Sequence, residues 1–199
     1  MPRIPIEELK KDIEFRATVG GVPLSFRTTW GLFSPEKIDE GTALLAKEIQ
    51  NIAAGNYKTA LDLGCGYGAL GIFLAKRAPE STVHLVDKDF VAVTYAKKNA
   101  ELNGAGNTSA YLSNGFDEVP KDLRFDLIVS NLPAKVSKEF FWILFAEAHE
   151  RLAVGGAFYV VTIAGLERLV QNNFKLIFEN YELLAHTKTY FVAKAVKSI

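Results

Sequence analysis

The first part of the chain alternates polar and apolar side chains in a way that is typical of a β-hairpin. Every second residue from Ile13 to Val19 is apolar, and Gly20-Gly21 separates this run from Val22–Phe26. Two glycines between two such runs fit a two-residue turn, because its central residues need a positive φ. Pro23 cannot donate a ladder hydrogen bond, so its strand is expected at a sheet edge.

A helix is predicted to follow this hairpin. Ser34 is a good helix cap and Pro35 suits the first helical position. Apolar residues at helical spacing then continue to about Ile49. The pattern therefore predicts a helix that begins at Ser34-Pro35 and ends near Ile49.

Beyond residue 56 the pattern alternates between short apolar runs and longer amphipathic stretches. The apolar runs have no polar face, which is expected when helices cover both faces of a parallel sheet. Two final runs, Tyr181–His186 and Tyr190–Val196, are spaced to form a hairpin. The remaining predicted strands are Thr59–Leu63, Thr82–Val86, Ser109–Leu112, Phe125–Ser130 and Ala157–Ile163, and the predicted helices are Ala69–Arg77, Phe90–Asn103, Ser137–Leu152 and Leu166–Phe178.

Length and composition are those of one ordinary globular domain. The chain has 199 residues, of which 49% are hydrophobic and 23% charged, and we expect a single domain with an N-terminal extension (1–56) and a core (57–199). No apolar run reaches the ~20 residues that a membrane span needs, and the N-terminus lacks the order of a signal peptide. We therefore expect a cytoplasmic protein with no membrane association.

Charge and cysteine content indicate which binding partners, nucleic acid or metal, are compatible with the sequence. Lys and Arg balance Asp and Glu at 23 each, which argues against sequence-independent binding to nucleic acid but allows a local basic rim. One cysteine and three scattered histidines give neither a disulfide framework nor a Cys/His metal cluster. We expect no bound metal.

The most informative segment joins an apolar run to a glycine-rich turn. Leu61-Asp62-Leu63 leads into Gly64, Gly66 and Gly68, and a second apolar run ends in Asp87. A strand turns this sharply into a helix, with its backbone close to a ligand, only where side chains are absent. An acid at the end of the next strand suits the two hydroxyls of a ribose. The spacing differs from the Gly-x-Gly-x-x-Gly dinucleotide motif, so a nucleotide-type ligand of another kind is predicted.

This segment resembles the first motif of class I methyltransferases, which bind S-adenosylmethionine (SAM) and release S-adenosylhomocysteine. The resemblance implies an α/β, Rossmann-like, doubly wound and mostly parallel sheet with an antiparallel C-terminal hairpin, here extended by an N-terminal β-hairpin. It also implies a cofactor site made of Asp62, Gly64, Cys65, Gly66, Gly68, Asp87, Lys88, Asn114 and Gly115.

Three of these side chains have predicted roles. Asp62 either fixes the loop or faces the cationic end of the ligand. Asp87 takes the ribose hydroxyls through charge-assisted hydrogen bonds, and Asn114 reads the adenine amino group. Cys65 is interpreted as a small loop residue, because nothing in the sequence nearby marks it as an activated nucleophile.

A second motif follows the fourth core strand. Asn131-Leu132-Pro133-Ala134 resembles the Asn/Asp-Pro-Pro-aromatic motif of methyltransferases that modify planar amino groups. Such a nitrogen is a poor nucleophile because its lone pair is delocalised. An Asn side-chain oxygen and a neighbouring backbone carbonyl can accept hydrogen bonds from its two N–H groups, which aligns the nitrogen and stabilises the charge that develops. No metal is needed.

The motif departs from the family pattern at two positions. Leu132 replaces the first proline, which is expected to loosen the backbone while leaving the carbonyl available. Ala134 replaces the aromatic residue that would stack on a base, an interaction worth about 1–3 kcal/mol. Trp30, Phe33, Phe140 or Trp142 could supply another face, although residues 140–142 fit the start of a buried helix better. Lys135 and Lys138 could meet a phosphate or could be ordinary solvated lysines.

A third segment points to one group within the class I methyltransferases. Trp30-Gly31-Leu32-Phe33-Ser34, Ile38-Asp39 and Gly41-Thr42 resemble a segment of the methyltransferase small domain group, which includes guanine-N2 methyltransferases of small-subunit ribosomal RNA. In that group the segment helps to enclose the cofactor, a role that the resemblance extends to Phe33, Gly41 and Thr42. The resemblance runs from about Phe26 to Val192. Bacterial ribosomal members often carry a second, degenerate domain, for which we expect no room in this chain.

Three functions remain open from the sequence. The first is a SAM-dependent N-methyltransferase that acts on a base in structured RNA, with a guanine amino group of ribosomal RNA as the leading substrate. The second keeps the chemistry but acts on a protein glutamine or a small molecule. The third is a non-catalytic SAM-binding module, suggested by the two departures in the motif.

Overall fold

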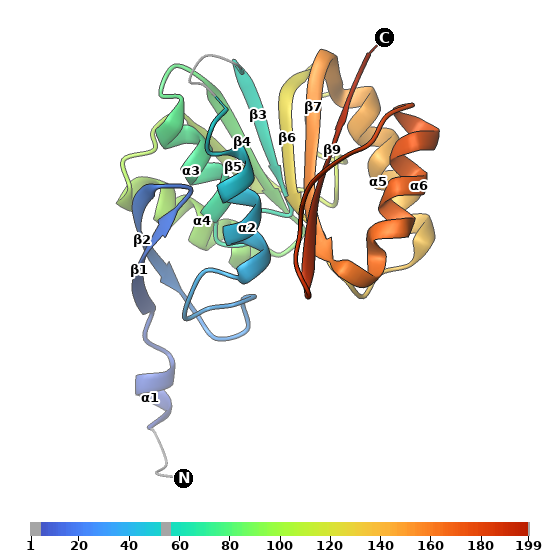
Figure 1. Cartoon of the computed structure of the whole chain (residues 1–199). Coiled ribbons are helices and arrows are strands. Elements are labelled where there is room, and N and C mark those ends of the chain that lie inside the picture. The colour runs from blue at the N-terminus through green and yellow to red at the C-terminus, as the bar shows by residue number, and fades with distance from the viewer. Residues whose placement is uncertain (1–4, 53–56, 199) are drawn as a thin grey trace.

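The computed structural model describes residues 5–52 and 57–198. Within these residues the strands form a seven-stranded sheet and a separate two-stranded hairpin (Figure 1). The elements are α1 (Ile6–Leu9), β1 (Ile13–Val19), β2 (Val22–Thr28), α2 (Glu40–Ile49), β3 (Thr59–Leu63), α3 (Ala69–Arg77), β4 (Thr82–Asp87), α4 (Phe90–Leu102), β5 (Thr108–Leu112), β6 (Phe125–Asn131), α5 (Lys138–Arg151), β7 (Leu152–Ile163), the 3₁₀ turn η1 (Ala164–Leu166), α6 (Glu167–Ile177), β8 (Glu182–His186) and β9 (Tyr190–Val196).

The large sheet has the order β5-β4-β3-β6-β7-β9-β8. Its first five strands are parallel, and the C-terminal hairpin pairs antiparallel with β7. The chain moves outward from β3 to β5 and then returns to place β6 on the other side of β3. The predicted fold, a mostly parallel doubly wound sheet with an antiparallel C-terminal hairpin, is confirmed.

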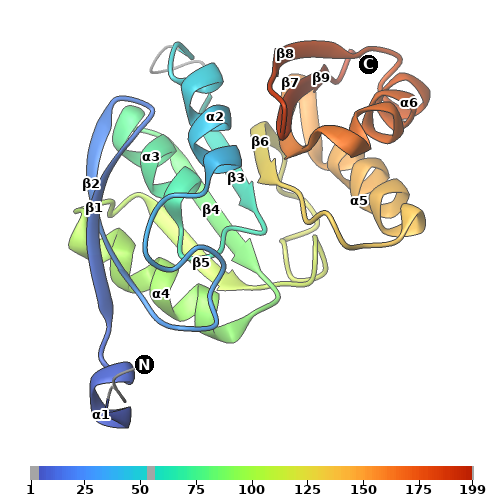
Figure 2. The ribbon, with the colours of Figure 1, turned by 60° about the horizontal axis from the view of Figure 1, so that its bottom comes forward.

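Helices cover both faces of this sheet, as Figure 2 shows from a second direction. Helices α2, α3 and α4 pack on one face, and α5 and α6 pack on the other. Neighbouring residues of β6 show why its strand is apolar throughout. Leu127 and Val129 are buried in the first core, whereas Ile128 is buried in the second. Among the described helices, none is long and apolar enough to cross a membrane.

The start of α2 differs from the prediction. The helix begins at Glu40, and its cap is Asp39, whose side chain accepts a hydrogen bond from the Thr42 N–H. Ser34 instead has a φ of 50° and donates its hydroxyl to the Lys37 carbonyl within a turn. A helix cap requires an extended conformation, which this positive φ excludes. The prediction that the helix begins at Ser34-Pro35 is therefore wrong, because the local Ser-Pro signal loses to a stronger cap five residues later.

The N-terminal hairpin is confirmed, with Gly20 and Gly21 at its turn. Both residues have a positive φ, 51° and 82°, as a two-residue turn requires. A side chain on Gly20 would lie only 2.4 Å from the Phe73 ring of α3, so the turn packs directly against the core. The predicted boundary of the extension, after residue 56, falls on residues 53–56, which lie outside the described part of the chain.

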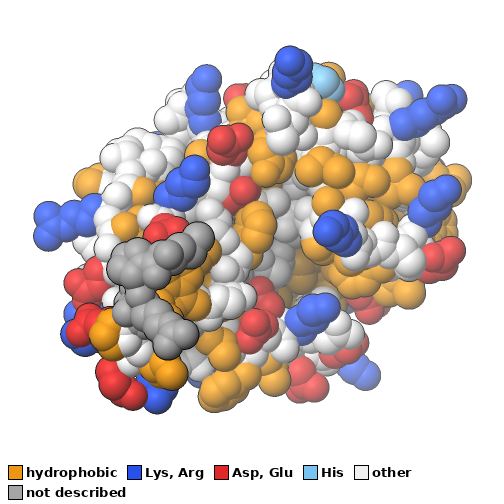
Figure 3. All heavy atoms as spheres, turned by 90° about the horizontal axis from the view of Figure 1, so that it is seen from below, with side chains coloured by type: hydrophobic (Ala, Val, Ile, Leu, Met, Phe, Trp, Pro, Cys, Tyr) orange, Lys and Arg blue, Asp and Glu red, His pale blue; other side chains and the backbone are white. Residues whose placement is uncertain are grey.

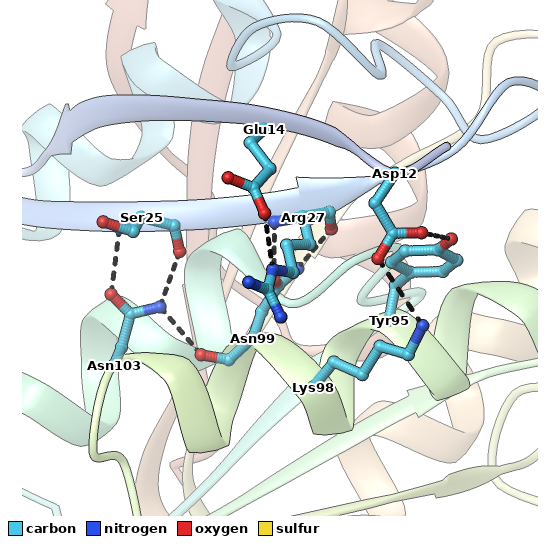
Figure 4. A network of polar contacts seen from close by, with 8 residues as sticks. All are labelled: Asp12, Glu14, Ser25, Arg27, Tyr95, Lys98, Asn99 and Asn103. Atoms are coloured by element: carbon cyan, nitrogen blue, oxygen red, sulfur yellow. Dashed lines mark hydrogen bonds and ion pairs between the residues drawn. The ribbon is translucent and has the colours of Figure 1, made fainter. Parts of the chain in front are cut away.

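Asn99 of α4 and Asn103, which caps the end of that helix, attach this hairpin to the core (Figure 4). The Asn99 side chain accepts a hydrogen bond from the Arg27 N–H at 2.7 Å and donates to the Arg27 carbonyl at 2.9 Å. Asn103 makes the same pair of contacts with Ser25, at 2.9 and 2.8 Å. Four residues of helix rise about 6 Å and two residues of strand about 6.7 Å. The two amides therefore match the free edge of β2 and take the place of a neighbouring strand.

Asn99 also links the hairpin to the glycine-rich loop. Its Nδ2 donates a second hydrogen bond to the Tyr67 carbonyl at 3.0 Å, and the residue is fully buried. The Tyr67 ring in turn packs edge-on against Phe15 and Phe26 of the hairpin. One buried amide thus joins three segments that are distant in sequence.

We expect Asn99→Ala to destabilise the protein strongly. The substitution leaves the buried Tyr67 carbonyl and the part-buried backbone groups of Arg27 unpaired. Each unpaired group costs about 1–3 kcal/mol, and relaxation should limit the total to about 2–4 kcal/mol. Urea unfolding of both proteins measures this difference. Asn103→Ala is the matched control, since Asn103 is only half-buried, and it should cost clearly less. Equal losses for the two variants would contradict this account of the attachment.

Candidate functional site

The candidate site lies where β3, β4 and β6 end. In Figure 3, which looks from below Figure 1 at the carboxyl ends of the parallel strands, hydrophobic side chains gather beside a hollow and acidic side chains lie near it. The strand order reverses at β3, with β4 on one side and β6 on the other, which makes this edge the expected ligand crevice of an open α/β sheet.

The glycine-rich loop is held by the end of β4. The backbone N–H groups of Gly64 and Cys65 both donate to the Val86 carbonyl at 2.9 Å, and the Gly66 N–H donates to Asp87 Oδ2 at 2.9 Å. Gly64, Gly66 and Gly68 have positive φ values of 73°, 54° and 94°. Local backbone conformation therefore requires glycine at all three positions.

The three glycines differ in what surrounds them. A Cβ on Gly68 would press on Ile72 and Leu85, at 3.1 and 3.2 Å, so this glycine serves helix packing. A Cβ on Gly64 or Gly66 would meet nothing within 4 Å. These two residues form an open, side-chain-free cradle of the kind that the predicted SAM would occupy.

Asp62 lies beneath this loop. It is 1% exposed, and its Oδ2 accepts the Gly71 N–H at 2.7 Å. Burial raises the pKa of Asp62 to about 7, against the lowering effect of the Gly71 hydrogen bond, and the charge of Asp87 raises it further. Asp62 is thus tied to the first turn of α3, directly after the loop, and its role toward the ligand stays a prediction.

Cys65 is buried within the loop. Burial, together with the charges of Asp62 and Asp87, raises the pKa of its thiol well above the ordinary value. A thiol in this state is a poor nucleophile, because the thiolate is the reactive form. This agrees with the interpretation of Cys65 as a small loop residue.

Asp87 ends β4 and is partly exposed at the loop. Its Oδ2 accepts the Gly66 N–H and its Oδ1 accepts the Asp89 N–H, each at 2.9 Å. Each oxygen keeps lone pairs for further donors, so the carboxylate can still accept the hydroxyl groups of a ribose.

A pocket of about 430 Å³ lies beside Asp87. It is lined by Lys88, Leu112, Ser113, Asn114, Asp117 and Glu118, and the Ser113 N–H donates to the Asp87 carbonyl at 2.9 Å. The structure thus brings the predicted Lys88 and Asn114 together. Asn114 Nδ2 donates to Asp117 Oδ2 at 3.2 Å, and Gly115 follows with a φ of 61°.

The segment before α2 lies on the other side of the crevice. Phe33 is 70% exposed, whereas Gly41 and Thr42 are buried in the first turn of α2. The Thr42 hydroxyl accepts a hydrogen bond from Asn131 Nδ2 at 2.9 Å. The predicted cofactor segment therefore contacts the predicted catalytic residue directly.

Asn131 is the last residue of β6. Besides Thr42, its Nδ2 donates to Asp39 Oδ2 at 2.9 Å. Within the described residues, the hydrogen bonds of the Asn131 side chain all involve Nδ2, which leaves Oδ1 to accept from a substrate.

Leu132 is held more firmly than its departure from the motif predicts. Its N–H, which a proline would lack, donates to the Val161 carbonyl of β7 at 2.8 Å, and the side chain is 3% exposed. Its carbonyl accepts the buried Thr162 hydroxyl at 3.1 Å and retains a second lone pair. The expectation that Leu132 loosens the backbone is wrong, because a ladder hydrogen bond and burial replace the proline ring.

The residues that follow lie at the surface. Pro133, Ala134, Lys135 and Lys138 are all exposed. The start of α5 is only partly buried: Phe141 is 1% exposed, whereas Trp142 is 45% exposed. Trp142 therefore remains available as an aromatic surface, as do Trp30 and Phe33, which are also exposed.

Three residues of the site escaped the sequence-based prediction. Asp39 lies in the segment that suggested the family, but nothing in the sequence links it to Asn131. Tyr190, whose hydroxyl donates to Asp39 Oδ1 at 3.3 Å, and Thr162 carry no local signal at all. Within the described residues, no group of three or more His, Cys, Asp or Glu side chains could hold a metal ion.

Comparison with known proteins agrees with this geometry. A solved structure, the T. thermophilus 16S rRNA N2 G1207 methyltransferase RsmC in complex with AdoMet and guanosine, superposes with a TM-score of 0.83 at 28% identity, over 98% of this chain and 52% of that one. Ribosomal RNA large subunit methyltransferase G of Shewanella putrefaciens is 27% identical over 88% of this chain and 50% of its own length. The chain thus spans about half the length of these two relatives.

A third relative has a similar length. The uncharacterized protein YbxB of Bacillus subtilis is 29% identical over 87% of this chain and 86% of its own. The family model described as methyltransferase small domain matches residues 23–194. This match confirms the predicted enzyme class and its methyl donor, SAM. The chain belongs to the methyltransferase small domain family.

Proposed function

We propose that this chain is an N-methyltransferase that methylates an exocyclic amino group of a base in structured RNA, and that guanine N2 of ribosomal RNA is its substrate. One observation carries the proposal. Asn131 ends β6 beside the predicted cofactor segment. Its Nδ2 donates hydrogen bonds to Asp39 and to Thr42, so both donors of the amide are occupied. Its Oδ1 is thereby offered to a substrate that donates N–H groups.

The relatives support the substrate class. Two of them carry names of ribosomal RNA methyltransferases. RsmC is named for the N2 position of a guanine, and its structure is a complex with AdoMet and guanosine. Both are about twice as long as this chain. That this chain recognises RNA is therefore part of our proposal. The net charge of zero suits a local contact around one pocket better than extended binding to phosphates.

The residues of the chain divide the work between holding the cofactor and aligning the substrate. When bound, SAM supplies an electrophilic methyl group. Gly64 and Gly66 would hold SAM in the cradle, and the Asp87 carboxylate would accept hydrogen bonds from its ribose hydroxyls. Asn131 Oδ1 and the Leu132 carbonyl accept the two N–H groups of the substrate nitrogen. This alignment stabilises positive charge as it develops on that nitrogen, and a proton then leaves to water.

We expect Asn131→Ala to reduce methyl transfer by about 10²–10³-fold, since it removes one preorganised acceptor. SAM affinity should change little. The assay uses methyl-labelled SAM with ribosomal RNA and ribosomal subunits from a strain that lacks the gene, followed by identification of the labelled nucleoside. Undiminished transfer by the variant would remove Asn131 from the mechanism.

The same assay distinguishes the alternative functions. Label that resists ribonuclease but is lost with protease, or that extracts into solvent, would move the substrate to a protein amide or a small molecule. Absence of label in every fraction, with SAM bound, would favour a non-catalytic module and would overturn the proposal.

A separate prediction concerns the cofactor. Asp87→Asn removes the charge that strengthens the ribose hydrogen bonds, and bonds to charged groups are worth about 1.5–3 kcal/mol. We expect the dissociation constant of SAM, measured by calorimetry, to rise about 10- to 100-fold. Asp89→Asn is the matched control, because the Asp89 side chain caps α4 through Val91 and Ala92 and only its backbone N–H contacts Asp87. A similar loss in both variants would argue against a ribose contact of Asp87.

A further inference from the structure

The orientation of the Asn131 amide is decided by its neighbour Asp39. An ionised carboxylate can only accept hydrogen bonds, whereas the two ends of an amide differ, one donating and one accepting. Asp39 Oδ2 lies 2.9 Å from the Asn131 side chain. The Nδ2 group must therefore face Asp39, because the opposite orientation would place two acceptors against each other.

We infer that Asp39 is a positioning residue, which holds the Asn131 amide with Nδ2 inward and Oδ1 directed away from Asp39 and Thr42 as the acceptor for the substrate amino group. This inference rests on the proposed function of Asn131. It extends that function to a residue that contacts neither reacting atom.

Asp39 is itself fixed from three directions. Its Oδ2 is shared between Asn131 and the Thr42 N–H, which lies at 3.1 Å, and its Oδ1 accepts the Tyr190 hydroxyl at 3.3 Å. Asp39 precedes α2, Tyr190 begins β9 and Asn131 ends β6. The carboxylate therefore joins the segment before α2 to two strands of the sheet.

The packing around Asp39 leaves no room for a side chain at position 41. A Cβ on Gly41 would lie 3.0 Å from Asp39 Oδ2 and 3.1 Å from the Tyr190 ring. Glycine at this position thus lets Tyr190 approach Asp39. Burial first, and then the charge of Asp39, raise the pKa of Tyr190, so its hydroxyl stays protonated and donates.

The charge of Asp39 also affects the acceptor strength of Asn131. Hydrogen bonds in a chain polarise one another. A carboxylate that accepts from Nδ2 increases the partial negative charge on Oδ1 of the same amide. Oδ1 then accepts more strongly from a nitrogen that gains positive charge during methylation.

Asp39→Asn tests this inference with little risk to folding. Asn is as good a helix cap as Asp, and the oxygen that accepts the Thr42 N–H can still accept from Asn131. The substitution removes the negative charge that strengthens this hydrogen bond and holds the amide in one orientation. We expect turnover to fall about tenfold, the difference between a charge-assisted and a neutral hydrogen bond, with the dissociation constant of SAM nearly unchanged.

A matched control is available at the other end of β6. The Asp126 carboxylate accepts the Lys58 and Thr59 N–H groups, far along the strand from Asn131. Asp126→Asn should leave turnover unchanged. An equal loss in this variant would show that any lost carboxylate contact lowers activity, and would overturn the specific role of Asp39.

A double-mutant cycle separates positioning from general damage. If Asp39 acts through Asn131, adding Asp39→Asn to Asn131→Ala should cause no further loss of turnover. If Asp39→Asn lowered turnover by the same factor in the wild-type protein and in Asn131→Ala, the inference would be contradicted.

A second readout does not depend on activity. In ¹⁵N-labelled protein, the Asn131 side-chain NH₂ signals, assigned by their absence in Asn131→Ala, should exchange with solvent slowly in the wild type. We expect exchange about tenfold faster or more in Asp39→Asn. Unaltered exchange would refute the positioning role, whereas a wild-type protein that fails to methylate RNA would refute the proposed function alone.

Discussion

The parallel pairing of β3 with β4 on one side and β6 on the other is the constraint on which the site depends. Leu63 is paired with Val86, and Asp62 is paired with Val129. One step beyond Leu63–Val86 come Gly64 and Asp87, and two steps beyond Asp62–Val129 come Gly64 and Asn131. The glycine cradle, the proposed ribose acceptor Asp87 and the proposed substrate acceptor Asn131 therefore lie at the same level along the sheet. A slip of one residue would turn the Asp87 and Asn131 side chains to the other face. The two apolar cores that fix the register therefore also fix the positions of these two side chains.

Side-chain amides then connect parts that the sheet cannot reach. A primary amide carries the same donor and acceptor as a peptide group, so it can complete a strand edge or end a strand. Asn99 and Asn103 use both groups on the backbone of β2. Asn131 uses only its donor and keeps its acceptor. The difference lies in the partner: a backbone edge engages both ends of an amide, whereas a carboxylate engages one and leaves the other for a ligand.

The sequence predicted the core strands and helices because each is determined by local periodicity, and it predicted Gly64, Gly66 and Asp87 because a sharp turn beside a ligand restricts residue type locally. It failed at Ser34, where two competing caps lie five residues apart and only tertiary contacts choose between them. Asp39 and Tyr190 could not be found in this way. Their contact joins residues 151 positions apart, and neither residue departs from what an ordinary cap or strand would contain.

The two departures from the family motif have different physical consequences. At Leu132 the proline ring is replaced by a hydrogen bond to β7 and by burial, and the carbonyl that the chemistry needs is fixed by Thr162. Nothing essential to alignment of a planar nitrogen is lost there. At Ala134 the missing group is the aromatic ring that would stack on a base. This ring holds the base but does not align its nitrogen, so its loss is expected to lower substrate affinity. The side chains of Trp30, Phe33 and Trp142 are exposed, so an aromatic surface for stacking is available without any change in the acceptors themselves.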